Sequence, residues 1–153
     1  MSAPIHLSRK KVARDPNVRW EGLNDFLAFA DPKTLSGAQR IASLAYWHWS
    51  HIKMGGYHDY FSTPPKTDYS EVAVALRDVG AMEMASLLTA TLEAIEAAGS
   101  KAPDSYASRF VAGVDAADFT EFEDEFARCA QAFLGCLLDY VEKHEAEFIE
   151  WTP

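Results

Sequence analysis

A predominantly apolar stripe near the C-terminus constrains the fold of this chain more than any other feature. Between Phe119 and Phe148 a large apolar or aromatic side chain recurs every three or four positions, the spacing of one helix face. The stripe consists of Phe119, Phe122, Phe126, Cys129, Phe133, Leu137, Tyr140, His144 and Phe148. Thr120 and Glu123 have the spacing of a capping box, and Gly135 is a point where the helix can bend or divide. We predict a long amphipathic C-terminal helix that buries this stripe against other helices.

Proline and glycine residues divide the rest of the chain into further predicted helices. Asp15-Pro16 begins a helix and Asp31-Pro32 ends it, because proline fits the first helical turn but not the interior. Another helix runs from its cap at Ser36 to Gly55-Gly56, and its apolar stripe is expected to face the core. Shorter helices are predicted over residues 68–79, 82–98 and 105–114. Because strand-like alternation is missing, the expected fold is all-α, an irregular bundle of about five to seven helices.

Length and composition predict a single domain. The chain has 153 residues, 48% of them hydrophobic, which is enough to build one core. Residues 1–14 hold Arg9, Lys10, Lys11 and Arg14 without sustained periodicity, and we expect a basic N-terminal arm there. Residues 15–153 form the expected helical domain. The apolar runs are too short to span a membrane and the N-terminus lacks the pattern of a secretion signal, so we expect a cytoplasmic protein without a membrane partner.

The sequence lacks the common catalytic motifs, including phosphate-binding loops, nucleophile elbows, paired Cys-x-x-Cys and His-Glu-x-x-His. We therefore expect a non-enzymatic protein without a cofactor. Three histidines offer an alternative, since His48 and His51 share one predicted helix flank and His58 follows the glycine pair. Such a set could ligate a divalent metal or contact a small molecule. The competing interpretation is that His48 is a core histidine, because it lies within the apolar stripe of its helix.

Negative charge is concentrated in the second half of the chain. The formal net charge is −9, and residues 101–153 contain 12 acidic and 4 basic side chains. Seven carboxylates fall on one side of the predicted C-terminal helix: Asp118, Glu121, Glu125, Asp139, Glu142, Glu147 and Glu150. This acidic face can be a solvated surface, or it can bind a basic protein in place of nucleic acid. Direct nucleic-acid binding is not expected, because carboxylates repel phosphates.

Two segments of the chain resemble a known family. They are residues 47–61, WHWSHIKMGGYHDYF, and residues 75–81, ALRDVGA. This pattern is similar to domain of unknown function 4375, the DNA-mimic-protein-19 family, whose hallmark is a helix ending in Asn-Gly-Gly-Phe, a Gln-Tyr-Phe-like tripeptide and a later helix ending in Ile-Gly-Ala. The matching motif residues are Gly55, Gly56, Tyr57, Tyr60, Phe61 and Gly80, whereas Met54 and Asp59 replace the usual asparagine and glutamine. The resemblance covers about residues 35–150.

The resemblance implies an all-helical fold and homodimerisation. For one well-known type of member it also implies binding of a helix-turn-helix repressor through an acidic surface that imitates DNA. Its hallmark positions are glycines and aromatics, which favour an architectural role over chemistry. We expect a non-enzymatic interaction protein whose acidic face binds a basic partner such as a helix-turn-helix DNA-binding protein. Two alternatives stay open. One is metal or small-molecule binding through His48, His51 and His58, and the other is neutralisation of a basic toxin.

Overall fold

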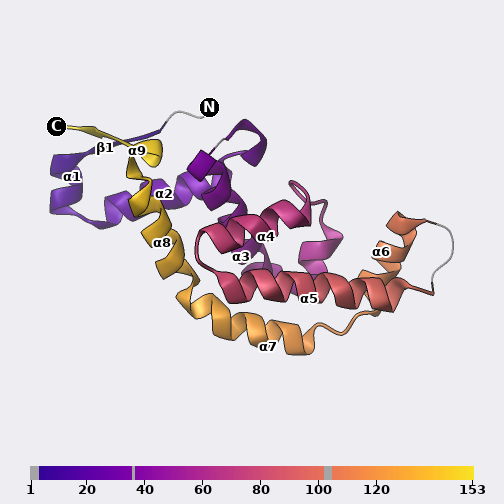
Figure 1. Ribbon diagram of the computed structural model, residues 1–153. Coiled ribbons are helices and arrows are strands. Elements are labelled where there is room, and N and C mark those ends of the chain that lie inside the picture. Colours follow the sequence, from indigo (N-terminus) through magenta and orange to yellow (C-terminus); the bar gives the residue numbers. More distant parts are fainter. Residues whose placement is uncertain (1–3, 36, 102–104) are drawn as a thin grey trace.

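The computed structural model describes residues 4–35, 37–101 and 105–153, and it confirms the all-α irregular bundle (Figure 1). Its elements are β1 (Ile5–Ser8), α1 (Arg9–Arg14), α2 (Asn17–Phe29), η1 (Pro32–Thr34), α3 (Gly37–Ser62), α4 (Tyr69–Asp78), α5 (Met82–Gly99), α6 (Tyr106–Ala116), α7 (Thr120–Cys129), η2 (Ala130–Ala132), α8 (Phe133–Lys143), α9 (Glu145–Phe148) and β2 (Ile149–Thr152). The η elements are single 3-10 turns. Ser36, the expected cap of α3, lies outside the described residues. None of the helices within the described ranges is both long and apolar enough to cross a membrane.

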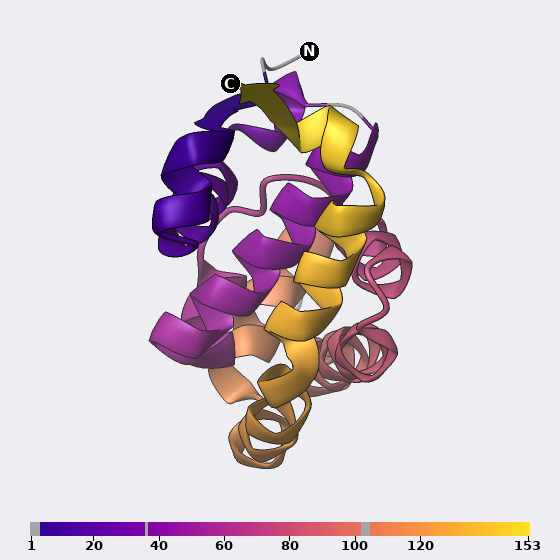
Figure 2. The same cartoon turned by 90° about the vertical axis from the view of Figure 1, so that its left-hand side faces the viewer.

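Helix α3 is the centre of the core, as its sequence predicted. Every side chain from Ala42 to Trp49 is buried, so this stretch is covered on all sides rather than on one face. Helix α8 runs beside it (Figure 2), and the Trp49 ring stacks on Phe133 of α8 with centroids 5.4 Å apart. Because α3 contacts the N-terminal, middle and C-terminal helices, it holds the bundle together.

The helix that was expected to end at the glycine pair instead kinks there and continues to Ser62. Gly56 has φ 78° and ψ 178°, whereas Gly55 does not have a positive φ. The conformation of Gly56 is not the left-handed cap that the sequence suggested but an extended mirror-image region that only glycine enters readily. The kink turns the short segment after Gly56 back toward the core, where Tyr57 and Tyr60 are fully buried.

Helices α4, α5 and α6 form a second layer, and α4 and α5 make a helical hairpin (Figure 1). Gly80, with φ 88°, ends α4 where predicted. Gly99, just beyond the helix predicted over residues 82–98, does not adopt a left-handed conformation. It remains helical and allows α6 to approach, since a Cβ on Gly99 would overlap the Arg109 carbonyl and one on Gly113 would overlap the Ile95 carbonyl. The two helices are therefore in backbone contact.

The predicted long C-terminal helix is divided into α7, α8 and α9. The break falls at the 3-10 turn Ala130–Ala132, and Gly135 lies inside α8 without bending it away from helix. The capping box is also absent, because Phe119 is the residue before α7 and the Thr120 N–H and hydroxyl donate to Asp118 instead. The apolar stripe survives the division, since each of its members is buried or half-buried.

Residues at the two ends of the chain pair with each other, which the sequence did not reveal. Strands β1 and β2 are parallel, with Ile5 opposite Ile149 and Leu7 opposite Trp151. From Ile5 onward, the segment expected to be a basic arm is thus a strand followed by α1, and the Arg9 guanidinium lies 5.0 Å from the centroid of the Trp151 ring. The sequence did not indicate this strand, because only Ile5 and Leu7 give the alternation that marks a strand.

Candidate functional site

The densest group of carboxylates in the structure lies on α7. Within residues 118–125, five side chains are acidic and exposed: Asp118, Glu121, Glu123, Asp124 and Glu125. We call these five residues the α7 acidic surface. Helix α7 runs along the lower edge of the molecule in Figure 1, with only one flank packed on the bundle. Arg128 is the one basic side chain on this helix, and it pairs with Glu125. The surface is therefore strongly anionic.

Within the α7 acidic surface, the carboxylates have different roles. Asp118 accepts from the Thr120 backbone at 3.0 Å, and this bond lowers its pKa. Glu123 reaches across to α3, as described below. The side chains of Glu121 and Asp124 make no hydrogen bond or ion pair with any other residue that the structure describes. These two side chains are the ones most available to a partner.

The remaining members of the predicted acidic face do not continue this surface. Asp139 and Glu142 are exposed on α8, beyond the 3-10 turn, while Glu147 and Glu150 belong to α9 and β2. The prediction that these seven carboxylates share one side of a continuous helix over residues 118–150 is therefore wrong, because that helix is broken twice. The seven carboxylates are distributed over separate elements.

The acidic residues nearest the C-terminus stabilise the fold. The Glu147 carboxylate accepts from the Ala38 N–H at 3.0 Å, and so satisfies a free donor at the start of α3. Glu150 lies opposite His6 in the sheet, at 3.3 Å. Glu145 accepts from Trp151 Nε1 at 2.7 Å and from Arg19 at 3.1 Å. These contacts give Glu147 and Glu150 a structural role that their position in the sequence did not indicate.

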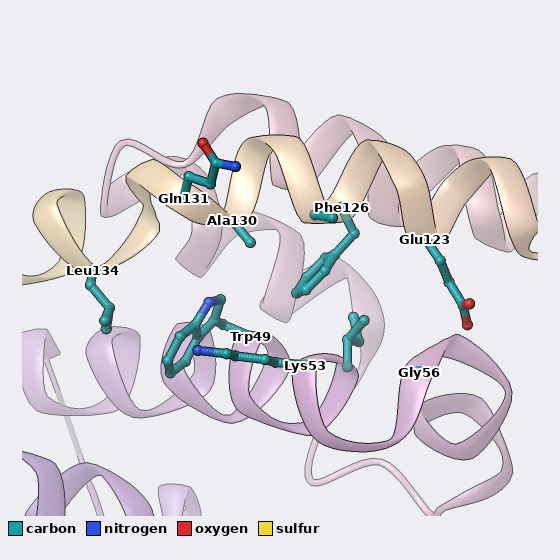
Figure 3. A pocket seen from close by; sticks show the side chains of 10 residues that line it. Trp49, Lys53, Gly56, Glu123, Phe126, Ala130, Gln131 and Leu134 are labelled. Atoms are coloured by element: carbon teal, nitrogen blue, oxygen red, sulfur yellow. The ribbon is translucent and has the colours of Figure 1, made fainter.

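An apolar groove of about 590 Å³ lies between α3 and the α7–α8 segment (Figure 3). Phe126 and Leu134 point from one wall toward Trp49 and Lys53 on the other, and the Lys53 ammonium sits 4.8 Å from the centroid of the Trp49 ring. Glu123 is at one end of the groove, facing the Gly56 kink. The α7 acidic surface thus borders a hollow with apolar walls.

Glu123 joins α7 to the kink in α3. Its Oε1 accepts from the Tyr57 N–H, directly after the kink, at 3.3 Å. A Cβ on Gly56 would lie 2.6 Å from the same oxygen. Gly56 is therefore required for its backbone conformation, and its missing Cβ also leaves room for this carboxylate. The sequence placed Glu123 in a capping box at its own helix, and only the three-dimensional contact reveals this role.

The aromatic motif residues are packed within the core. Tyr57 and Tyr60 are 0% exposed and Phe61 is 4% exposed. The Tyr60 ring lies 5.0 Å from Trp47 and 4.9 Å from His48, measured between centroids, and burial raises the pKa of its hydroxyl. Together with Gly55, Gly56 and Gly80, these residues shape the α3 kink and the end of α4. Their place in the structure agrees with the architectural interpretation.

The three histidines considered as metal ligands occupy different environments. His48 is fully buried, neither ring nitrogen has a hydrogen-bond partner among the described residues, and burial lowers its pKa to about 3. His51 pairs with Asp59 at 2.9 Å, over the bare backbone of Gly55, and His58 pairs with Asp115 at 3.2 Å. In the described part of the chain, no group of three or more histidine, cysteine, aspartate or glutamate side chains is placed to hold a metal ion. The geometry thus disagrees with a shared histidine site.

Comparison with known proteins gives one match. The model of the family described as DMP19-like protein matches residues 33–144, from η1 to the start of α9 and including the α3 kink and α7. No curated protein and no solved structure matches the chain. The matched region covers well over half of the residues and contains both segments on which the resemblance was based. The chain therefore belongs to the DMP19-like protein family.

Proposed function

We propose that this protein is a non-enzymatic interaction protein that binds a basic DNA-binding protein through the α7 acidic surface, in place of DNA. The observation that carries the proposal is the density of exposed carboxylates on α7 in a member of the DMP19-like family. The four members that lie on α7 itself, Glu121, Glu123, Asp124 and Glu125, span about 6 Å of helix at 1.5 Å per residue, and the pairing of Glu125 with Arg128 leaves roughly one uncompensated charge per 2 Å. Duplex DNA carries one charge per about 1.7 Å of its axis, so a phosphate-reading surface would meet a similar density of charge.

Two further features support an interaction role for this part of the molecule. The groove beside α7 supplies apolar wall residues, and interfaces commonly combine an apolar centre with a charged rim. Glu83 of α5 and Glu125 line a shallower hollow on the other side of α7, which extends the negative charge toward α5. Burial, together with proximity to Glu83 and Glu125, raises the pKa of Cys129 between them. A basic partner would therefore meet negative charge on the exposed side of α7 and in the hollow toward α5.

The proposal is tested by capturing partners from a lysate of the source cell at low salt with paired charge variants. Glu121→Gln with Asp124→Asn removes two carboxylates from the α7 acidic surface without touching a described hydrogen bond. The matched controls remove two exposed carboxylates elsewhere, Glu21→Gln with Asp25→Asn on α2 and Asp139→Asn with Glu142→Gln on α8.

The α7 pair is expected to weaken binding at least about tenfold, because each close charge pair at an interface contributes on the order of 1 kcal/mol or more. The α2 pair should leave binding unchanged. Binding of the unmodified protein should also fall steeply as salt is raised. Equal capture by the α7 variant and the unmodified protein would refute the proposal, and loss confined to the α8 pair would assign the contact to α8 instead.

A further inference from the structure

A second hollow, on helices other than α7, combines aromatic walls with an acidic rim. It has a volume of about 540 Å³ and lies between α4, α5 and α6. Three of its lining residues are aromatic and form a row of nearly parallel rings. Tyr69 and Phe110 have centroids 6.1 Å apart at 22°, and Tyr106 and Phe110 have centroids 6.5 Å apart at 31°. Tyr106 is 75% exposed, so its ring is held at the opening rather than in the core.

The charged residues around this hollow are mostly acidic. Asp68, Glu93 and Glu96 line it and are exposed, and among the described residues Arg109 is the one lining residue with a permanent positive charge. Three carboxylates facing one guanidinium leave the hollow with a negative charge. Aromatic faces carry negative quadrupole potential as well, so the walls and the rim attract the same kind of ligand.

We infer that this hollow binds the guanidinium or ammonium group of an arginine or lysine side chain from a basic protein segment. Such a cation would lie against the exposed Tyr106 ring and pair with Glu93 or Glu96, the combination that proteins use to hold organic cations. The inference goes beyond the α7 contact, since it concerns different helices and is tested without any partner protein.

Arg109 makes the charge preference of the hollow measurable. If the ligand is a cation, Arg109 competes with it for the carboxylates, and Arg109→Gln should tighten binding. If the ligand were an anion, the same change would remove its only fixed positive partner and weaken binding. The two cases therefore give opposite signs with one variant.

The experiment is a titration of the ¹⁵N-labelled full chain, followed by NMR, with N-acetyl-arginine amide and N-acetyl-lysine amide. The neutral N-acetyl-glutamine amide and inorganic phosphate are the controls. Tetramethylammonium tests whether the hollow prefers a free organic cation. Backbone signals of residues 68–70, 93–96 and 106–110 should shift with the two cationic amides and not with the controls. Glu93→Gln with Glu96→Gln should abolish the shifts, and Tyr106→Ala should weaken binding about two- to fivefold.

Three results would overturn the inference. They are shifts of equal size with the neutral amide, binding of phosphate that depends on Arg109, and absence of shifts with the cationic amides. If tetramethylammonium bound more tightly than either amide, the hollow would be a site for a free organic cation and not for a protein side chain. If this titration shows no binding, the capture experiment still tests the proposed function by itself, because none of the variants used in the titration alters α7. The Glu21→Gln and Asp25→Asn protein serves as the matched charge control.

Discussion

Alanine in place of Gly113 is expected to destabilise the fold by about 3 kcal/mol or more, despite the higher helix propensity of alanine. The added Cβ would overlap the Ile95 carbonyl oxygen and lie 2.9 Å from the Ile95 Cγ2, so α5 and α6 would have to separate. Separation would expose Ile95 and Val114, which are both buried. Urea unfolding followed by circular dichroism measures the loss as a lower midpoint.

Gly135→Ala is the matched control for this prediction. Gly135 is also inside a helix, but a Cβ there has no neighbour within 4 Å. The control should be neutral or gain up to about 1 kcal/mol from helix propensity. Gly113→Ala with a midpoint equal to that of Gly135→Ala would show that α5 and α6 are not in backbone contact.

Acid is expected to destabilise the protein before its carboxylates are protonated, because of His48. Burial lowers the pKa of His48 to about 3, whereas an unfolded histidine titrates near 6.5. The unfolded chain therefore binds a proton below pH 6.5 that the folded chain excludes, and stability present above pH 6.5 is lost as pH falls toward 3. Between pH 6.5 and 4.5 this difference corresponds to about 2 to 3 kcal/mol.

The control is His48→Leu, which removes the titrating group and leaves an apolar side chain beside Tyr60. Urea unfolding of both proteins at pH 7.5, 6.5, 5.5 and 4.5 should show a steep loss in the unmodified protein and a smaller slope in the variant. Below pH 4.5 both proteins should also lose stability through Glu71, because the Arg40 side chain lowers its pKa to about 2 and its unfolded form binds a proton first. The unmodified protein should keep losing stability through His48 until about pH 3. Identical slopes between pH 6.5 and 4.5 would mean that His48 is not sealed from solvent.

Local signals predicted most of the helices. Proline and glycine mark the ends of α2 and α4 in the sequence, and the apolar stripe of α3 identified the central helix. The breaks around α8 could not be read in the same way, because Ala130–Ala132 contains neither residue and its apolar spacing continues without interruption. The β1–β2 pair joins residues more than 140 positions apart, and two strands of four residues carry too little alternation to be distinguished from loops.

The candidate site was predictable in charge but not in geometry. Counting residues located the negative charge near the C-terminus, and α7 is where its exposed part is densest. The predicted acidic face grouped Glu121 with Glu147 and could not distinguish their roles. Glu121 is exposed, whereas Glu147 caps α3 through a contact that spans 109 residues. The prediction that the three histidines share one site disagrees with the structure for a related reason. Their helix spacing suggested convergence, but the Gly56 kink and burial of α3 send His48 and His58 into different surroundings.

The central claim is that the α7 acidic surface occupies the DNA-binding surface of its partner. It is tested most directly by adding the protein to a complex of the captured partner with its labelled operator DNA and following release of the DNA. We expect stoichiometric release by the unmodified protein and by the Glu21→Gln, Asp25→Asn control, and at least about tenfold weaker release by the Glu121→Gln, Asp124→Asn variant. A ternary complex in which the partner holds DNA and this protein together would contradict the claim.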